Sequence, residues 1–143
     1  MIKFNKVFLD TVPLIYFLDA DVKFGEKTKS ILEEILSSGK SLVSSTITYK
    51  EYLSYPYRLG NQEKIDVFFE FSKAYGVDFV PLSPEIIKLA IRFTDGYYKF
   101  NTADYLQLAV ADHTGCDLFL TNDKELERFE RLRCVTIEDW KLS

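Results

Sequence analysis

Four acidic side chains stand next to segments that an α/β chain would bring to one edge of its sheet. Asp10 and Asp123 each follow a short apolar run typical of a buried strand, and Asp104 falls in the first turn of a predicted helix. Glu51 lies on a helix predicted after a further short strand. In open α/β sheets, ligands bind beyond the carboxyl ends of the strands. The pattern therefore predicts that all four carboxylates meet at one site.

Carboxylates gathered in this way call for a cation. Two carboxylates in close contact repel each other by about 4 kcal/mol at an intermediate dielectric, so stability alone does not explain such a cluster. Oxygen ligands without sulfur or imidazole suit hard cations that keep several waters and accept phosphate oxygens. The residue types thus predict a site for Mg2+ or Mn2+.

Each acid also has an ordinary explanation when it is taken alone. Asp10 can cap the following helix, with Pro13 in its first turn. Thr48 and Glu51 have the spacing of a capping box. Since 22 of the 143 residues are Asp or Glu, any single one is expected at the solvated surface. The metal-site prediction therefore depends on the four acids as a set.

Other catalytic constellations fit the sequence poorly. His113 is the only histidine, which argues against a Ser-His-Asp triad and against a two-histidine, metal-free ribonuclease. Cys116 and Cys134 lack metal-ligand spacing, so zinc is not expected, and both are predicted to be reduced core residues. There is no glycine-rich phosphate loop. A phosphate-accepting role for Asp10 lacks a second adjoining acid, and Val12 stands where a DxD phosphatase has one.

Length and composition indicate one globular domain that spans residues 1–143. The net charge of -4 argues against a protein that grips nucleic acid through a broad basic surface, although a bound divalent cation can supply positive charge locally. Hydrophobic residues form 47% of the chain, enough for a core and for a protein interface. Asp10 and Asp19 interrupt the N-terminal apolar stretch, so we expect no signal peptide, no membrane span and a cytoplasmic location.

The elements that must position the acids alternate between strands and helices. Short apolar runs predict five strands, at 6–9, 41–44, 77–82, 118–120 and 134–137. Helical periodicity fills the segments between them. The alternation predicts an α/β protein with three layers, α/β/α, and a central, mainly parallel sheet of about five short strands.

Single residues predict several helix boundaries and one buried face. Thr102 is placed to cap the helix of Asp104. The helix that carries Glu51 is expected to end before Pro56. One later helix is expected to bury a single apolar face, formed by Ile86, Ile87, Ala90 and Ile91.

Four tyrosines lie close together on and just after the helix of Glu51. Tyr49, Tyr52 and Tyr55 recur every three residues, and Tyr57 follows. One explanation is an aromatic stripe in the core. The other is a partly buried face that serves as a docking groove.

These motifs resemble, in order and spacing, those of the PIN domain family, and within it the VapC-type toxins of prokaryotic toxin-antitoxin pairs. The four family motifs are resembled, in order, by the segments FLDTVPLIYFLD, TYKEYL, ADYLQLAVA and FLTNDKEL. They carry, in the same order, Asp10 with Thr11, Glu51, Asp104, and Thr121 with Asp123. Two positions depart from the family pattern: Val12 replaces a common asparagine, and Glu125 stands where many relatives have an aspartate.

The resemblance implies a metal-dependent endoribonuclease that hydrolyses phosphodiester bonds of RNA with Mg2+ or Mn2+ as cofactor. It implies that Asp10, Asp104 and Asp123 are metal ligands, directly or through water. Glu51 would be a further ligand or would orient the attacking water. All four acids are thus implied to be catalytic.

The resemblance also implies roles for residues beside the acids. Thr11 and Thr121 would hydrogen-bond the carboxylates, and Asn122 would either contact a ligand or hold the turn. A basic cluster near the fourth motif would meet RNA phosphates or form a solvated helix face. It comprises Arg128, Arg131 and Arg133.

Three partners are implied in the same way. They are single-stranded or loop RNA as substrate, a cognate antitoxin protein that covers the tyrosine-bearing groove and the acidic pocket, and a second copy of the chain in a homodimer. The competing interpretation is a non-catalytic PIN-like module that binds RNA or protein without cutting it. Metal-dependent cleavage of RNA distinguishes the two.

Overall fold

The computed structural model describes residues 3–96 and 98–143 and has a five-stranded sheet at its centre. The strands are β1 (Lys6–Leu9), β2 (Ser41–Ser45), β3 (Asp78–Val80), β4 (Leu118–Thr121) and β5 (Cys134–Thr136). They are all parallel and lie in the order β3-β2-β1-β4-β5. The third strand is shorter than the predicted 77–82, because it pairs with β2 over three residues only. The chain runs outward from β1 to β2 on one side and later to β4 on the other, which puts a topological switch point between β1 and β4.

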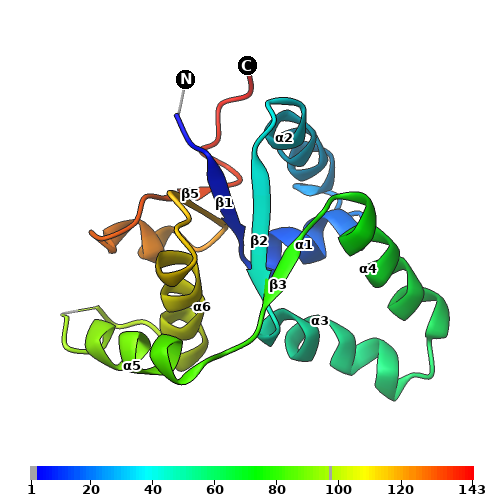
Figure 1. Cartoon of the computed structure of the whole chain (residues 1–143). Coiled ribbons are helices and arrows are strands. Elements are labelled where there is room, and N and C mark those ends of the chain that lie inside the picture. Colours follow the sequence, from blue (N-terminus) through cyan, green and yellow to red (C-terminus); the bar gives the residue numbers. More distant parts are fainter. Residues whose placement is uncertain (1–2, 97) are drawn as a thin grey trace.

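Helices cover both faces of the sheet, which confirms the predicted three-layer α/β/α fold (Figure 1). One face carries α1 (Thr11–Leu18), α2 (Gly25–Ser37), α3 (Ile47–Arg58) and α4 (Gln62–Ala74). The other carries α5 (Pro84–Phe93), α6 (Thr102–His113) and the short 3-10 helix η1 (Lys124–Arg128).

Side chains of each central strand enter two separate cores. Val7 and Leu9 of β1 pack with α1 to α4, whereas Phe8 packs with α5 and α6. Phe8 also stacks on Phe119 of β4, with ring centroids 4.9 Å apart. All four side chains are fully buried. Burial on both faces explains why these strands are apolar at every position and not at alternate ones.

Polar side chains cap the two helices that begin at the carboxyl edge of the sheet beside β1 and β4. Asp10 caps α1, as predicted, and accepts a hydrogen bond from the backbone N–H of Thr11. The predicted cap of α6 was wrong by one residue, because Asn101 and not Thr102 provides it. Asn101 and Asp104 form a capping box, in which each side chain accepts a hydrogen bond from the backbone N–H of the other.

Helix α3 does not end before Pro56, as predicted, but continues to Arg58. A proline inside a helix lacks one N–H donor and costs about 3 kcal/mol. Here the ring of Pro56 is buried, and Tyr52 one turn earlier is buried too, with its hydroxyl donating to Asp19 at 2.8 Å. This packing offsets the loss. The Pro56 carbonyl also accepts a 2.8 Å hydrogen bond from the backbone N–H of Asn61, which holds the connection to α4.

The buried face of α5 differs from the predicted one. Ile86, Ala90 and Phe93 are buried against α6, whereas Ile87 and Ile91 are 36% and 61% exposed. A helix that rests on a single neighbour buries a narrow stripe, and positions 86, 90 and 93 form that stripe. The two remaining isoleucines therefore stay at the surface.

The tyrosines of α3 divide between core and surface. Tyr49 and Tyr52 pack on Phe68 of α4, with ring centroids 5.6 and 5.5 Å away. Tyr55 and Tyr57 are 61% and 78% exposed. The core explanation is thus right for the first two tyrosines, and the outer two remain at the surface.

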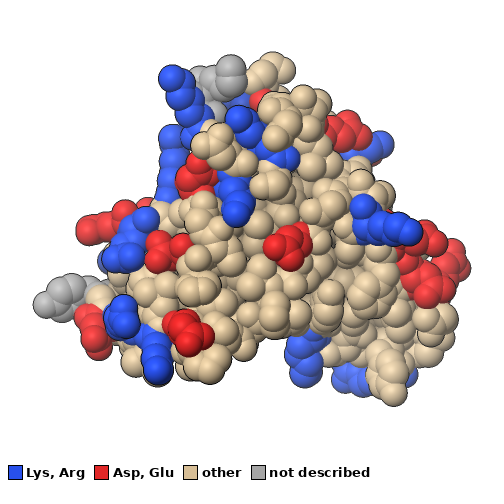
Figure 2. Space-filling view, viewed as in Figure 1, with Lys and Arg blue, Asp and Glu red and all other residues tan. Residues whose placement is uncertain are grey.

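Charged side chains on the face drawn in Figure 2 lie mostly around its margins, and the middle of that face is mainly uncharged. Around these margins basic and acidic side chains are mixed, which fits a net charge of only -4. Among the residues that the structure describes, no helix is both long enough and apolar enough to cross a membrane.

Candidate active site

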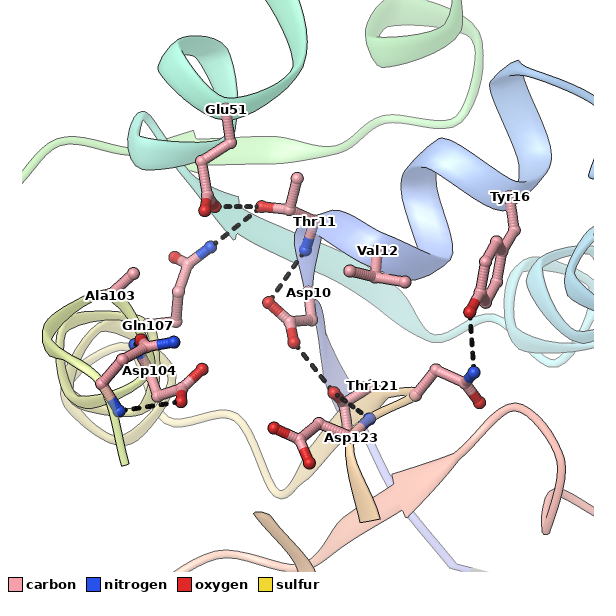
Figure 3. A pocket seen from close by; sticks show the side chains of 12 residues that line it. Asp10, Thr11, Val12, Tyr16, Glu51, Ala103, Asp104, Gln107, Thr121 and Asp123 are labelled. Atoms are coloured by element: carbon pink, nitrogen blue, oxygen red, sulfur yellow. Dashed lines mark hydrogen bonds between the residues drawn. The ribbon is translucent and has the colours of Figure 1, made fainter. Parts of the chain in front are cut away.

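A pocket lies beyond the carboxyl ends of β1 and β4, at the switch point of the sheet (Figure 3). All four acids singled out in the sequence line it, although they come from four distant segments. The residues that line the pocket are Asp10, Thr11, Val12, Tyr16, Glu51, Asn101, Ala103, Asp104, Gln107, Thr121, Asn122 and Asp123. Folding therefore brings Asp10, Glu51, Asp104 and Asp123 to one place.

Asp10 is the most strongly perturbed acid of the pocket. Its carboxylate accepts hydrogen bonds from the backbone N–H of Thr11 and the hydroxyl of Thr121, both at 2.9 Å. Burial is the main reason why its pKa is raised from 3.8 to about 6. The charges of Asp104 and Glu51 add to this rise, and the two hydrogen bonds oppose it. A desolvated carboxylate among like charges is one that a bound cation would stabilise.

Asp104 is held at the start of α6 by its capping box. Its backbone N–H donates to the Asn101 side chain at 2.7 Å, and its carboxylate accepts from the Asn101 backbone at 3.1 Å. Partial burial raises the pKa of Asp104, the hydrogen bond from Asn101 opposes the rise, and the charges of Asp123 and Glu51 add to it. The acids of the pocket thus act on one another electrostatically.

The turn after β4 presents Asp123 at the mouth of the pocket. The Thr121 hydroxyl, which donates to Asp10, also accepts from the backbone N–H of Asp123 at 3.1 Å. Asp123 is exposed and caps η1 through a 3.0 Å bond from the Glu125 backbone N–H. Asn122 donates to the Tyr16 hydroxyl at 2.7 Å, which ties the turn to α1. This contact is compatible with the turn-holding role suggested for Asn122.

Glu51 is exposed and is held by a hydroxyl group from another helix. The Thr11 hydroxyl donates to Glu51 Oε1 at 2.7 Å. The suggested capping box of Thr48 and Glu51 was wrong, because the N-cap of α3 is Thr46. Thr48 is instead fully buried, with its hydroxyl 2.8 Å from that of Thr11. A buried partner holds the Thr48 hydroxyl away from the helix start, so the box cannot form.

The donor set of the pocket fits a hard divalent cation. Four carboxylates line it, and none of its described lining residues is Lys, Arg, His or Cys. Within residues 3–96 and 98–143, no three His, Cys, Asp or Glu side chains stand close enough to enclose a metal ion by themselves. Mg2+ commonly binds through one or two carboxylates and keeps several waters, so an open arrangement of acids suits it.

Sequence reasoning missed three polar residues of this pocket. Asn101 and Tyr16 hold Asp104 and Asn122, as described above. Gln107 is 2% exposed and lies one turn after Asp104 on α6. Its signal in the sequence is an amide within the mostly apolar segment 105–111, where another apolar residue is expected.

The basic cluster lies at the surface and is partly paired with acids. Arg128 lies 3.5 Å from Glu125, and Arg131 lies 3.3 Å from Asp112. Both arginine side chains are 61% exposed, and Arg133 is exposed as well. These contacts favour the explanation as a solvated surface.

The remaining reactive side chains lie outside the pocket. Cys116 and Cys134 are buried and free, which confirms the prediction of reduced core cysteines. Burial raises the pKa of their thiols to about 11 and about 12, so both are protonated at neutral pH. His113 is exposed at the end of α6.

The fold and the pocket together define a three-layer α/β protein with an acidic site at the switch point of a parallel sheet. The family model of the PIN domain matches residues 7–132, which is most of the chain. The chain belongs to the PIN domain family. No curated protein sequence matches it.

Solved structures with a similar fold contain toxins of toxin-antitoxin pairs. A toxin-antitoxin complex from Klebsiella pneumoniae has a chain 17% identical, with a TM-score of 0.69, and the match covers 92% of this chain and 97% of that one. VapBC2 from Rickettsia felis, bound to a DNA fragment from its promoter, is 16% identical, with a TM-score of 0.70 and coverages of 92% and 98%. VapC20 from Mycobacterium tuberculosis, a toxin that cleaves the sarcin-ricin loop, is 14% identical, with a TM-score of 0.64 and coverages of 89% and 98%. At such identities the likeness concerns the fold.

Proposed function

We propose that this PIN-domain protein is a metal-dependent endoribonuclease and the toxin component of a toxin-antitoxin pair. One observation carries the proposal: Asp10, Glu51, Asp104 and Asp123, from four distant segments, line a single pocket without a basic neighbour among its described lining residues. Their mutual repulsion would weaken the fold if they served it alone. A bound cation would offset this repulsion and would attract an anionic substrate.

Asp10, Asp104 and Asp123 would hold Mg2+ or Mn2+, directly or through water, and Glu51 would be a further ligand or would orient the attacking water. When bound, the cation supplies a water of lowered pKa and neutralises charge on the phosphate oxygens. Thr121 keeps the Asp10 carboxylate in place, and Thr11 holds Glu51 Oε1. Glu51 Oε2 would then be available to ligate the cation or to orient the attacking water, and no histidine base would be needed.

The substrate class we propose is single-stranded or loop RNA. Asp123 and Glu51 are exposed at the pocket, and the flexible backbone of a single strand or loop can bend a phosphodiester into it more easily than the regular backbone of a duplex. The net charge of -4 fits a protein whose affinity for RNA comes from the bound cation more than from a basic surface. Such a toxin would act in the cytoplasm, where its RNA substrate is.

The protein partner we propose is a cognate antitoxin. Structural neighbours from Klebsiella pneumoniae and Rickettsia felis are complexes of this kind. Tyr55 and Tyr57, exposed on α3 close behind Glu51, offer the aromatic surface that protein interfaces favour. We also propose a homodimer, because Ile87 and Ile91 on α5 leave apolar surface uncovered.

Cleavage of labelled RNA by the purified chain tests the enzymatic proposal. We expect cleavage with Mg2+ or Mn2+, none with chelator, and loss of cleavage in Asp10→Asn and Asp104→Asn variants that keep their circular dichroism spectra. Cleavage that survives both substitutions would eliminate this site. RNA binding without cleavage under any of these conditions would instead favour the non-catalytic module.

Copurification tests the proposed partner. We expect the chain to bind the product of a small adjacent reading frame that encodes a DNA-binding protein with a disordered tail, and to lose RNA cleavage in that complex. A complex that forms and leaves cleavage unchanged would contradict an antitoxin role.

A further inference from the structure

The Glu51 carboxylate is held in the pocket by a hydrogen bond from a buried residue. It is an exposed side chain on α3, and a free glutamate on a helix surface samples several rotamers. The Thr11 hydroxyl donates to Glu51 Oε1 at 2.7 Å, and Thr11 itself is 4% exposed. What holds the Thr11 hydroxyl therefore decides how well Glu51 is held.

The Thr11 hydroxyl has one proton, which goes to Glu51, so its oxygen accepts from its other neighbours. Thr48 Oγ1 lies 2.8 Å away and Gln107 Nε2 lies 3.4 Å away. The Ser44 hydroxyl oxygen lies 3.2 Å from Thr48 Oγ1, and the Ser44 hydroxyl donates to the Leu9 carbonyl oxygen at 2.9 Å. The Thr48 hydroxyl can therefore donate to Thr11 Oγ1, which lies closer to it than the Ser44 hydroxyl does.

The Gln107 amide starts this chain of hydrogen bonds, and its orientation follows from Ser45. The Ser45 hydroxyl accepts from the backbone N–H of Ile47 at 3.2 Å and donates its proton to Gln107 Oε1. The amide nitrogen must then face the two threonines, with Nε2 3.3 Å from Thr48 Oγ1 and 3.4 Å from Thr11 Oγ1. The two N–H groups of the Gln107 amide can thus donate to the two threonine hydroxyl oxygens.

These contacts form one directed path, in which each group donates to the next and the last acceptor is Glu51. Figure 3 shows its outer part, from Gln107 through Thr11 to Glu51. Its inner members are almost fully buried, since Ser45 and Thr48 are 0% exposed and Gln107 is 2% exposed. An apolar side chain of the same size would avoid the cost of burying an amide. The amide is better explained by what it does to the pocket than by what it adds to the core.

We infer that Gln107 is a positioning residue, which acts through Thr48 and Thr11 to fix the Glu51 carboxylate in the pocket. Its role in catalysis rests on the proposed endoribonuclease function, whereas its effect on the Glu51 side chain does not. Gln107 also lies on the same helix as Asp104, so α6 places two of the four acids, one directly and one through this path.

The first test is kinetic. Gln107→Met keeps the length of the side chain and removes its hydrogen bonds, and we expect kcat for RNA cleavage to fall about 10- to 100-fold. KM for RNA should change less than about threefold, because the Gln107 side chain is only 2% exposed at the pocket wall and its amide group bonds Thr11 and Thr48. The matched control is Gln62→Met, an exposed glutamine on α4 that bonds Asp66, which should leave kcat unchanged.

A double variant separates positioning from a merely structural role. In a Glu51→Gln background, adding Gln107→Met should lower kcat less than about threefold, since the group it positions has already been altered. A further loss as large as that in the wild-type background would overturn the inference and leave the proposed function standing. If Gln107→Met fails to fold, Thr48→Val replaces it, with Thr48→Ser, which keeps the hydroxyl, expected to restore kcat.

The second test needs neither metal nor activity. In metal-free protein, three-bond NMR couplings should show one χ1 rotamer for Glu51 in the wild type and in Gln62→Met, and rotamer averaging in Gln107→Met and Thr48→Val. Averaging already present in the wild type, or a single rotamer in all four proteins, would overturn the inference. A wild type that shows this rotamer pattern but does not cleave RNA would overturn the proposed function alone.

Discussion

At the amino edge of the sheet, Asp117 stands just before β4 and accepts hydrogen bonds of 2.9 to 3.0 Å from the backbone N–H groups of Asn5 and Lys6. At the carboxyl edge, Asp10 stands just after β1, but burial and the charges of neighbouring acids raise its pKa to about 6. Both acids adjoin strand ends. Both carboxylates accept hydrogen bonds, but Asp117 lies beside a lysine, whereas Asp10 lies among other carboxylates.

We interpret the difference as one between an acid that stabilises the fold and acids that bind the proposed cation. Lys40 donates a 3.2 Å hydrogen bond to the side chain of Asn5, whose backbone N–H bonds Asp117, so lysines and this acid lie together at the amino edge. All ion pairs found among the described residues lie outside the acidic pocket. The carboxyl edge is thus where we propose that a cation binds.

The largest expected effect is on catalysis and separates the two edges directly. Asp10→Asn should lower the rate of RNA cleavage by about 10³-fold or more, because loss of a ligand charge removes several kcal/mol of transition-state stabilisation. Asp117→Asn should keep the rate within about twofold. Cleavage assays on both variants at saturating Mn2+ measure this, and equal losses at the two edges would contradict the assignment.

The next largest effect is on stability: the Asp10→Asn substitution that is expected to slow cleavage should stabilise the metal-free fold at neutral pH. Because the folded pKa of Asp10 is about 6 and the unfolded value is 3.8, the folded state keeps a proton between these pH values that the unfolded state has lost. Asp10 therefore stabilises the fold at low pH, and this contribution, roughly 2 to 3 kcal/mol, is lost as pH rises from about 4 to 6.

Urea unfolding in chelator measures this loss. At pH 7 we expect Asp10→Asn to be more stable than the wild type, and the free-energy difference between the two proteins to shrink as pH falls from 6 to 4. A wild type that is more stable than Asp10→Asn at pH 7 without metal would show that the buried charge is well accommodated.

Divalent metal should reverse the weakness of the carboxyl edge. At about 100 times its dissociation constant, Mg2+ or Mn2+ should add roughly 2.7 kcal/mol to the free energy of unfolding, because it binds only the folded chain. The gain should be much smaller in Asp104→Asn and unchanged in Asp117→Asn. Melting temperatures with and without millimolar metal measure it, and equal shifts in all three proteins would place the metal elsewhere.

The smallest effect concerns the amino edge alone. Asp117→Asn keeps one acceptor oxygen in place of two and loses part of its three backbone hydrogen bonds, so we expect a loss of about 1 kcal/mol in unfolding free energy. Metal should not change this loss. A metal-dependent effect at Asp117 would remove the contrast between the two edges.

The strands and the acidic set could be predicted because their signals are local. Strands that are covered on both faces are apolar at consecutive positions; Asp10 follows such a run directly, and Asp123 follows another within three residues. Helix details failed where a neighbour outweighed the local rule. Pro56 lies inside α3 because its ring packs in the core, and Ile91 is exposed because α5 rests on α6 by another stripe.

Pattern and periodicity determined by themselves that this chain forms a parallel α/β sheet and that acids follow its strands, since these depend on neighbours within a few residues. Only the tertiary structure decided which hydrogen bonds those acids receive. Gln107 reaches Thr11 across 96 positions of the chain, and Thr121 reaches Asp10 across 111. Contacts of this kind follow from how strands and helices pack in three dimensions, and no local pattern in the sequence encodes them.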